Sequence, residues 1–424
     1  MLIHAIDGIF MDFNIMKIKV RPLILVIVKL SDLELFVSTA HSLFEALKNI
    51  LPEIAGNALR TEYIRRIPEE NMQLIKRIGL HRAFQPKKFG GAEMSLFQFT
   101  ECIVLLAGAC ASTAWVVSLL CSHSHLLALF SARTQHDVWG SDPDAVACSS
   151  IAPHGLVEEV DGGILFTGEK GWSSGCDHAQ WSIIGFHRMT TDGSPQFSLA
   201  VLPRSDYGIR DEWFAAGMKG SGTKTLLIDR VFIPEYRIQR VELLMQGQSD
   251  GFGIYPDSEI FYSPFRPYFA SGFSCVSLGI AQRALVLFQD STAQRIKTND
   301  SSANGLTPRL MRLAESNQQV ASAEALLKKI WRETTQYSAQ HRYPSRMTLA
   351  LWRTGQAYAI KMCIEAVDRL FTASGGQVWL ECSEMQRLFR DSHMTGAHIY
   401  GNYDSCMQIL GRELAGLDPD PNIF

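Results

Sequence analysis

The stretch Gly171-Trp172-Ser173-Ser174-Gly175-Cys176-Asp177-His178 lies between two strand signals. It follows the turn pair Asp161-Gly162 and precedes the strand-like run 181–187. Glycine lets a backbone approach another group closely, and serine supplies short hydrogen bonds. The loop therefore suits contact with a flat polar ring, although a plain turn without a ligand explains its composition equally well. It marks a β region that contains a candidate cofactor wall.

The composition is that of a globular protein with two or three domains. The chain has 424 residues, of which 46% are hydrophobic, and a net charge of −3. This balance argues against disorder and against a nucleic-acid partner, which leaves a basic footprint. None of the nine cysteines forms a Cys-x-x-Cys pair. We expect reduced, buried thiols in a cytoplasmic protein.

The first forty residues are atypical. The apolar run 22–30 follows basic residues but is too short to span a membrane. No clear small-residue cleavage site follows it. We expect a buried strand or an N-terminal extension over residues 1–40 rather than a signal peptide, and no membrane partner.

Helical patterns enclose the β region on both sides. Apolar residues recur at helical spacing over about 31–140, with Pro52 after the first helix, and strand and turn signals fill 146–234. Helical patterns return near residue 268, with Thr307-Pro308 opening one helix and a second over 347–371. We predict an N-terminal helical domain over 1–142, a β domain over 143–240 and a helical bundle over 241–424.

The segment His123-Ser124-His125 carries two histidines in an apolar run. Residues at i and i+2 on a helix point to different faces, so they do not form a metal site together. Taken alone, each histidine is better explained as a hydrogen-bonded core residue.

Several segments resemble the acyl-CoA dehydrogenase superfamily. Met218-Lys-Gly-Ser-Gly-Thr-Lys224 with Val231-Phe-Ile-Pro234 is similar to its β-domain signature, and Arg387-Leu-Phe-Arg-Asp391 to its late helical motif. The resemblance implies an α+β fold: an N-terminal helical domain, a central β-barrel-like domain and a C-terminal four-helix bundle.

A closer resemblance is to the oxygenase components of two-component p-hydroxyphenylacetate 3-hydroxylases. It extends from about Leu43 to the C-terminus, and the first forty residues depart from it. Its motifs are Ile78-Gly-Leu-His-Arg-Ala-Phe-Gln-Pro86, Leu106-Ala-Gly-Ala-Cys-Ala111, Ser122-His-Ser-His125, Ser149-Ser-Ile-Ala-Pro153, the stretch 172–178, Arg266-Pro-Tyr-Phe269 and His393-Met-Thr-Gly-Ala-His398.

The resemblance implies a flavin-dependent monooxygenase. Such an enzyme takes reduced FMN, or FAD, from a separate NAD(P)H-flavin reductase. With O2 the flavin forms a C4a-hydroperoxide that hydroxylates a phenol at the ortho position, while the protein supplies a dry, oriented pocket. The implied reaction converts 4-hydroxyphenylacetate to 3,4-dihydroxyphenylacetate. The implied assembly is a cytoplasmic homotetramer.

The resemblance also assigns site residues. The implied flavin-binding residues are Trp115, Trp172, Ser173, Ser174 and Arg295. The resemblance to acyl-CoA dehydrogenases implies that Arg295 reaches a flavin phosphate across a subunit interface. The implied substrate-binding residues are His123, Ser149, Arg266, Phe269, His398 and Tyr400. The implied catalytic residues are His123, Ser149 and Ser174.

Each role follows from side-chain chemistry once the resemblance is accepted. Ser174 is placed near the flavin N5 edge, where a hydroxyl steadies the hydroperoxide. His123 accepts or shares the phenol proton, and Ser149 holds the same oxygen. Arg266 suits a carboxylate, and Phe269 suits the aromatic ring. An acidic phenol is the substrate class that these residues favour.

Structural interpretations remain open for several of these residues. In these interpretations Ser174 caps its own loop, and Trp115 or Trp172 is an ordinary core residue. Arg266 would form a salt bridge between helices, and Arg295 a surface ion pair.

Three other functions remain as alternatives for this sequence. An acyl-CoA dehydrogenase needs a carboxylate base, which the superfamily places after a late Ile-Tyr, but here Gly401-Asn402 follows Ile399-Tyr400. The same flavin chemistry on indole, a larger phenol, a sulfur compound or an amine is the second alternative. A non-enzymatic assembly protein is the third.

Overall fold

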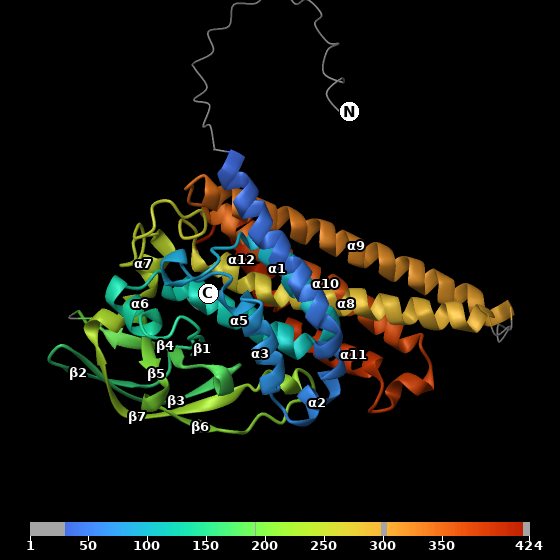
Figure 1. The fold of residues 1–424 in the computed structure, drawn as a ribbon, viewed down its shortest axis with the longest axis horizontal. Coiled ribbons are helices and arrows are strands. Elements are labelled where there is room, and N and C mark those ends of the chain that lie inside the picture. Colours follow the sequence, from blue (N-terminus) through green and yellow to red (C-terminus); the bar gives the residue numbers. More distant parts are fainter. Residues whose placement is uncertain (1–29, 191, 298–302, 419–424) are drawn as a thin grey trace, which may run out of the picture. The chain divides into compact units, whose positions relative to one another are not determined.

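The structure is a computed structural model that describes residues 30–190, 192–297 and 303–418 (Figure 1). The chain divides into two units, residues 1–39 and 40–424. The apolar run predicted to be a strand or an extension lies outside the described residues up to position 29.

Among the described residues, six α-helices precede the β strands. They are α1 (Leu30–Gly56), α2 (Ala58–Tyr63), α3 (Glu69–Arg77), α4 (Leu96–Ala109), α5 (Ala111–Leu127) and α6 (Ala132–Trp139). Ser95 caps α4 by accepting a hydrogen bond from the Gln98 amide. Pro52 lies inside α1, so its predicted place after the helix is wrong. A proline within a helix removes one backbone hydrogen bond, and the helix here continues past it.

The β region consists of two four-stranded sheets. One has the order β1 (Ala147–Ser150), β4 (Trp181–Met189), β5 (Pro195–Pro203) and β8 (Ile238–Arg240). The other has the order β2 (Leu156–Val160), β3 (Gly163–Ser173), β7 (Lys224–Pro234) and β6 (Gly208–Arg210). Among the described strands the sheets do not close into a barrel. The barrel-like form expected from the sequence is therefore corrected, because strands of one sheet do not pair with those of the other.

Two strand predictions are confirmed. The turn at Asp161-Gly162 joins antiparallel strands β2 and β3, with Gly162 at φ 77°. The run from residue 181 is β4, which pairs in parallel with β1 and antiparallel with β5. A separate apolar core between the sheets includes Ile164, Phe166 and Phe186.

The C-terminal part is helical. Its elements are α7 (Val241–Gln246), α8 (Phe265–Lys297), α9 (Ala303–Ala339), α10 (Arg346–Thr372), α11 (Glu384–Ala397) and α12 (Tyr403–Leu414). Helices α8, α9 and α10 pack along one another, and α11 and α12 pack on α10 (Figure 1). The predicted helix over 347–371 is confirmed by α10. The predicted start at Thr307-Pro308 is wrong, because α9 begins at Ala303 and includes Pro308.

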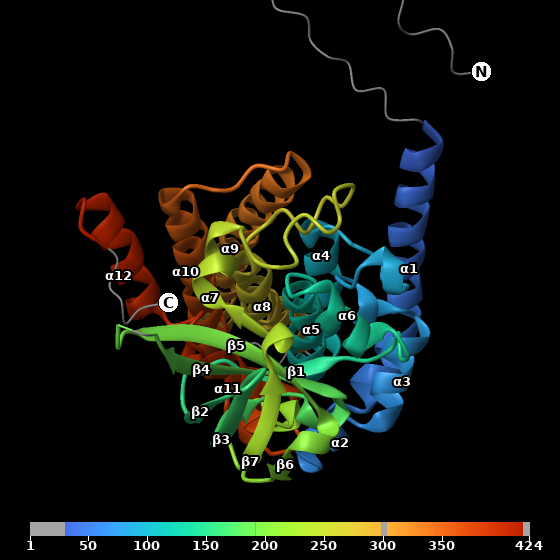
Figure 2. The same ribbon diagram turned by 90° about the vertical axis from the view of Figure 1, so that its left-hand side faces the viewer.

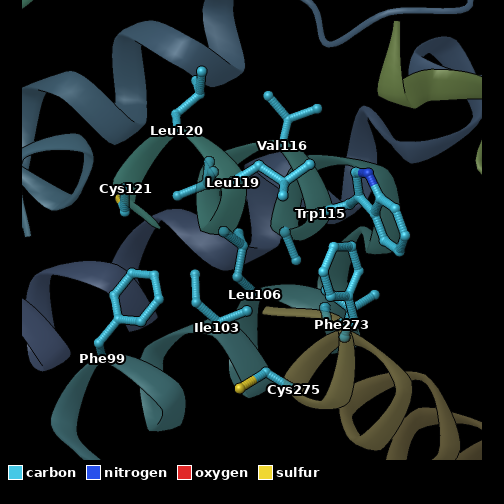
Figure 3. Packing of buried hydrophobic residues seen from close by; sticks show 14 of the residues in the cluster. Phe99, Ile103, Leu106, Trp115, Val116, Leu119, Leu120, Cys121, Phe273 and Cys275 are labelled. Atoms are coloured by element: carbon cyan, nitrogen blue, oxygen red, sulfur yellow. The ribbon is translucent and has the colours of Figure 1, made fainter. Parts of the chain in front are cut away.

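Helix α8 is the central element of the bundle. Among the described residues it is the one helix that is long and apolar enough to cross a membrane, but 72% of its apolar window is buried inside the protein. Its side chains Phe273 and Cys275 meet Ile103 and Leu106 of α4 (Figure 3). Its apolar residues therefore form the protein core. All nine cysteines are free, and all except Cys382 are buried.

Candidate active site

Helix α5 carries two of the predicted site residues into the interior. Every residue of α5 is buried, and the helix packs on both β1 and α8 (Figure 2). Its small polar residues are compatible with this burial because their hydroxyls bond backbone carbonyls, as Ser122 does with those of Ser118 and Tyr268. An apolar helix with serines can thus lie between a sheet and a helix and still present Trp115 and His123.

The structure brings His123 and Ser149 into direct contact. His123 Nδ1 lies 2.7 Å from the Ala147 carbonyl oxygen, and Nε2 lies 2.8 Å from Ser149 Oγ. Because a carbonyl only accepts, Nδ1 carries the proton and Nε2 is an acceptor in the neutral ring. Burial lowers the pKa of His123 to about 4, despite the opposing effect of the Ala147 hydrogen bond. At neutral pH the ring is therefore an uncharged base with one acceptor nitrogen facing Ser149.

His125 has different surroundings, as its position on the helix predicts. Its Nε2 bonds the Ile260 carbonyl at 2.9 Å, and its ring stacks on Tyr268 at 3.9 Å between centroids. Among the described residues no group of acidic, histidine or cysteine side chains could hold a metal ion. His125 is a core residue, and the two histidines do not form a shared site.

Ser174 lies at the junction of the β3 loop and α5. Its Oγ accepts from Trp115 Nε1 at 3.2 Å and shares a hydrogen bond with Thr223 Oγ1 at 2.7 Å. Gly175 allows this approach, because its φ is 70° and a Cβ there would lie 2.5 Å from Val116 Cγ1. The loop is therefore shaped to bring a serine hydroxyl against the α5 tryptophan.

Thr223 and Ser221 extend this contact into a chain of hydroxyls. Ser221 Oγ and Thr223 Oγ1 are 2.7 Å apart, and both residues are buried. Sequence reasoning did not identify them as site residues. The turn residues around Ser221 were visible, but only the pairing of β3 with β7 brings Thr223 to Ser174.

Trp172 and Ser173 lie in unlike environments. Trp172 is 76% exposed, meets the Trp213 ring at 5.6 Å, and has a left-handed backbone with φ 63°. Such a conformation is uncommon for a bulky residue and concentrates at ligand sites. Ser173 is fully buried, and its Oγ has no hydrogen-bond partner within the described part of the chain. The exposed indole and the Ser174 hydroxyl chain fit a flat ring with polar edges, as a flavin has.

A cluster of rings joins His123 and Ser149 to the remaining predicted substrate residues. Phe269 of α8 lies 5.8 Å from the His123 ring and 5.2 Å from the Tyr400 ring. Phe273 stacks on His398 at 3.9 Å. It also meets Trp115 at 4.9 Å (Figure 3). Burial lowers the pKa of His398 to about 3, so it is uncharged.

This cluster assembles residues from α5, α8 and the segment after α11 that are far apart in sequence. Its aromatic members are Trp115, His123, Phe269, Phe273, His398 and Tyr400.

Arg266 lies at the end of this cluster. Burial lowers the pKa of its guanidinium, which Tyr400 opposes, and its Nε has no partner within the described residues. Arg266 and Tyr400 both line a cavity of about 210 Å³. Among the described residues Arg266 forms no ion pair with an acidic side chain, so the alternative of an inter-helix salt bridge is not what the structure has.

Arg295 lies apart from these residues. It is exposed in the last turn of α8. At about 1.5 Å of rise per residue, the helix separates it from Arg266 by roughly 44 Å. Within one chain Arg295 and Arg266 cannot contact the same ligand, which leaves the role across a subunit interface implied by the resemblance as a prediction.

Comparisons with known proteins identify the family of the chain. The family model for the acyl-CoA dehydrogenase C-terminal domain matches residues 271–403. The chain is 58% identical over 383 residues to the oxygenase component of p-hydroxyphenylacetate 3-hydroxylase from Acinetobacter baumannii, covering 90% of this chain and 91% of that protein.

More distant relatives share the whole fold. Identity is 32% to the flavin-dependent monooxygenase oxygenase subunit HsaA of Mycobacterium tuberculosis, with 90% of this chain and 97% of the relative covered. The crystal structure of 3-HSA hydroxylase from Rhodococcus sp. RHA1 superposes with a TM-score of 0.85 at 28% identity, covering 92% of this chain and all of that one. The chain therefore belongs to the oxygenase components of two-component flavin-dependent monooxygenases, which have the acyl-CoA dehydrogenase fold.

Proposed function

We propose that this enzyme hydroxylates a phenol bearing an acidic side chain at the ortho position, most simply 4-hydroxyphenylacetate to 3,4-dihydroxyphenylacetate. The phenol, O2 and reduced FMN give the catechol, water and oxidised FMN. A separate NAD(P)H-flavin reductase supplies the reduced FMN. The observation that carries this proposal is the buried pair of His123 and Ser149, whose acceptor nitrogen and hydroxyl are 2.8 Å apart.

The pair binds the phenol hydroxyl and draws off its proton. The phenol ring attacks an electrophilic oxygen faster when its hydroxyl is partly or fully deprotonated, because the ring is then richer in electrons. His123 Nε2 can accept that proton, while Nδ1 stays bonded to the Ala147 carbonyl and holds the tautomer. With a pKa of about 4 the free imidazole is a weak base, so it takes the proton as negative charge develops on the substrate oxygen.

In this proposal the acid group of the substrate faces Arg266. Phe269 contacts both the His123 ring and the Tyr400 ring, which suits an aromatic substrate ring packed against Phe269. Arg266 then meets the acid group, because a buried guanidinium with an unbonded Nε lacks an anion. The 58% identity to a p-hydroxyphenylacetate hydroxylase component supports the same substrate.

On the flavin side, Ser174 is the residue that we expect to limit the loss of hydrogen peroxide without hydroxylation. Reduced flavin, when bound, supplies the electrons that activate O2. A serine hydroxyl has one donor and two acceptor sites, and Ser174 uses two of these three on Trp115 and Thr223. The third is available to a ligand. Trp115, Trp172 and Ser173 complete the proposed ring wall.

The proposed role of Arg295 requires an assembly of several chains. In the proposed homotetramer the bundles pack together, and Arg295 of one chain binds the flavin phosphate of another, because its own site is too far along α8. This accounts for a cationic residue remote from Arg266 along the same helix.

The test is a product assay. Purified protein, a flavin reductase, NADH and FMN are supplied with 4-hydroxyphenylacetate, resorcinol, a steroid phenol or indole, and products and peroxide are quantified. We expect the catechol of 4-hydroxyphenylacetate in the highest yield. Oxidation of indole alone, or reduction of bound flavin by an acyl-CoA without O2, would contradict the proposal.

A further inference from the structure

A buried arginine also lines the cavity that the half-buried Arg266 and Tyr400 share. It is Arg353 of α10, only 8% exposed. Glu413 is the one acidic residue of this lining, and it pairs with the more exposed Arg346 at 2.5 Å. The inner wall of the cavity is therefore cationic.

The partners of Arg353 are neutral. Its guanidinium lies 4.4 Å from the centre of the Tyr400 ring, and Nη2 donates to the Ile399 carbonyl at 3.3 Å. Its Nε and Nη1 are buried and have no hydrogen-bond partner in the described part of the chain. Within those residues it forms no ion pair with an acidic side chain, and neither does Arg266. Each of the two guanidinium groups thus retains buried N–H groups without an acceptor.

This arrangement is unfavourable without an anion. A buried charge normally has an opposite charge or a full set of hydrogen bonds. Two cations close together also repel, and the Arg353 charge contributes to lowering the pKa of Arg266, after burial itself. The fork of a guanidinium matches the two oxygens of a carboxylate. The cavity therefore has the donors and the charge to bind one acid group strongly.

Building on the proposed function, we propose that Arg353 is a second binding residue for the acid group of the substrate, and that the pair of arginines makes the enzyme selective for phenols with an anionic side chain. The ring cluster connects this cavity to His123 and Ser149, because Phe269 contacts both Tyr400 and His123. Tyr400 lies against Arg353 and orients it toward the substrate tail.

The experiment compares an acid with its neutral analogue. Dissociation constants for 4-hydroxyphenylacetate and 2-(4-hydroxyphenyl)ethanol are measured by anaerobic calorimetry on the protein with reduced FMN. Arg353→Gln should weaken binding of the acid about ten- to a hundredfold, the loss of a charge-assisted contact. It should change binding of the alcohol less than about threefold, because the neutral tail presents no anion.

Arg412→Gln is the matched control. Arg412 also lines the cavity and carries the same charge, but it is less buried and its Nε already donates to the Asp418 carbonyl. Its substitution should change the affinity for the acid less than about threefold, because exposed charges are screened. Arg353→Lys, which keeps the charge without the fork, should fall between the wild type and Arg353→Gln.

A stability measurement separates binding from a structural role. Arg353→Met should leave the melting temperature of the ligand-free protein unchanged or higher, because it removes an unpaired buried charge. It should also abolish most of the rise in melting temperature that 4-hydroxyphenylacetate gives the wild type. Equal weakening of acid and alcohol, or unchanged affinity for the acid, would overturn the role of Arg353. A wild type that hydroxylates no phenol would instead overturn the proposed function.

Discussion

Replacing Ser174 with alanine tests the proposed flavin wall most directly. The change removes the acceptor of Trp115 Nε1, which is buried and has this hydroxyl at 3.2 Å. An unsatisfied buried donor costs about 1–3 kcal/mol, and Thr223 keeps its contact with Ser221. We therefore expect a loss of roughly 1–3 kcal/mol in the free energy of unfolding. We also expect the fraction of O2 released as peroxide to rise, because the remaining hydrogen-bonding site of Ser174 is lost.

A buried serine outside the proposed flavin wall is the control. Ser198 of β5 is fully buried, and its Oγ has no hydrogen-bond partner among the described residues, so Ser198→Ala removes no hydrogen bond seen in the structure. Its free energy of unfolding should change by less than about 0.5 kcal/mol or rise slightly.

Urea unfolding of the flavin-free proteins gives the stabilities, and product and peroxide yields with reduced FMN give the coupling. Equal effects of the two substitutions on both quantities would refute the assignment of Ser174. An unaltered Ser174→Ala variant would refute the hydrogen-bond reasoning as well.

Four further substitutions have distinct expected outcomes. His123→Asn should lower hydroxylation about 100-fold or more while O2 consumption continues, since general base catalysis contributes about 10²–10⁴-fold; an unchanged ratio of catechol to peroxide would contradict this role. Arg266→Gln should raise KM for 4-hydroxyphenylacetate about tenfold or more but leave a neutral phenol unaffected, and steady-state kinetics with both would show it. Stability should fall as pH is lowered from 6.5 to about 4, because burial holds the pKa of His125 near 4 and the unfolded chain binds the proton first. In His125→Gln, the free energy of unfolding should fall less steeply with decreasing pH across this range, as denaturation at several pH values would show. Burial raises the pKa of Asp391 to about 6, which has the opposite effect on stability, but this effect is the same in both proteins and cancels in the comparison. Lys170→Met should lose roughly 3 kcal/mol of stability, since the buried ammonium donates to three backbone carbonyls, and an unchanged melting temperature would show that these contacts contribute little.

Much of the local structure could be predicted from periodicity and turn residues. The hairpin at Asp161-Gly162, strand β4 and helix α10 follow from signals within a few residues of each other. The different surroundings of His123 and His125 also follow from helix geometry alone. Element ends were less predictable, as Pro52 and Pro308 show, because packing along a long helix can outweigh one lost hydrogen bond.

The sequence by itself determined the order of helical and β regions, the glycine and serine loop over 171–178, and the residue types available for flavin chemistry. Only the tertiary structure decided which of these residues meet. Pairing of β3 with β7 put Thr223 beside Ser174, and packing of α5 on β1 put His123 against Ser149 and lowered its pKa to about 4. The burial of Arg353 beside Tyr400 had no local signal. These contacts join residues far apart in the chain, so they depend on how whole elements pack rather than on the spacing of neighbours.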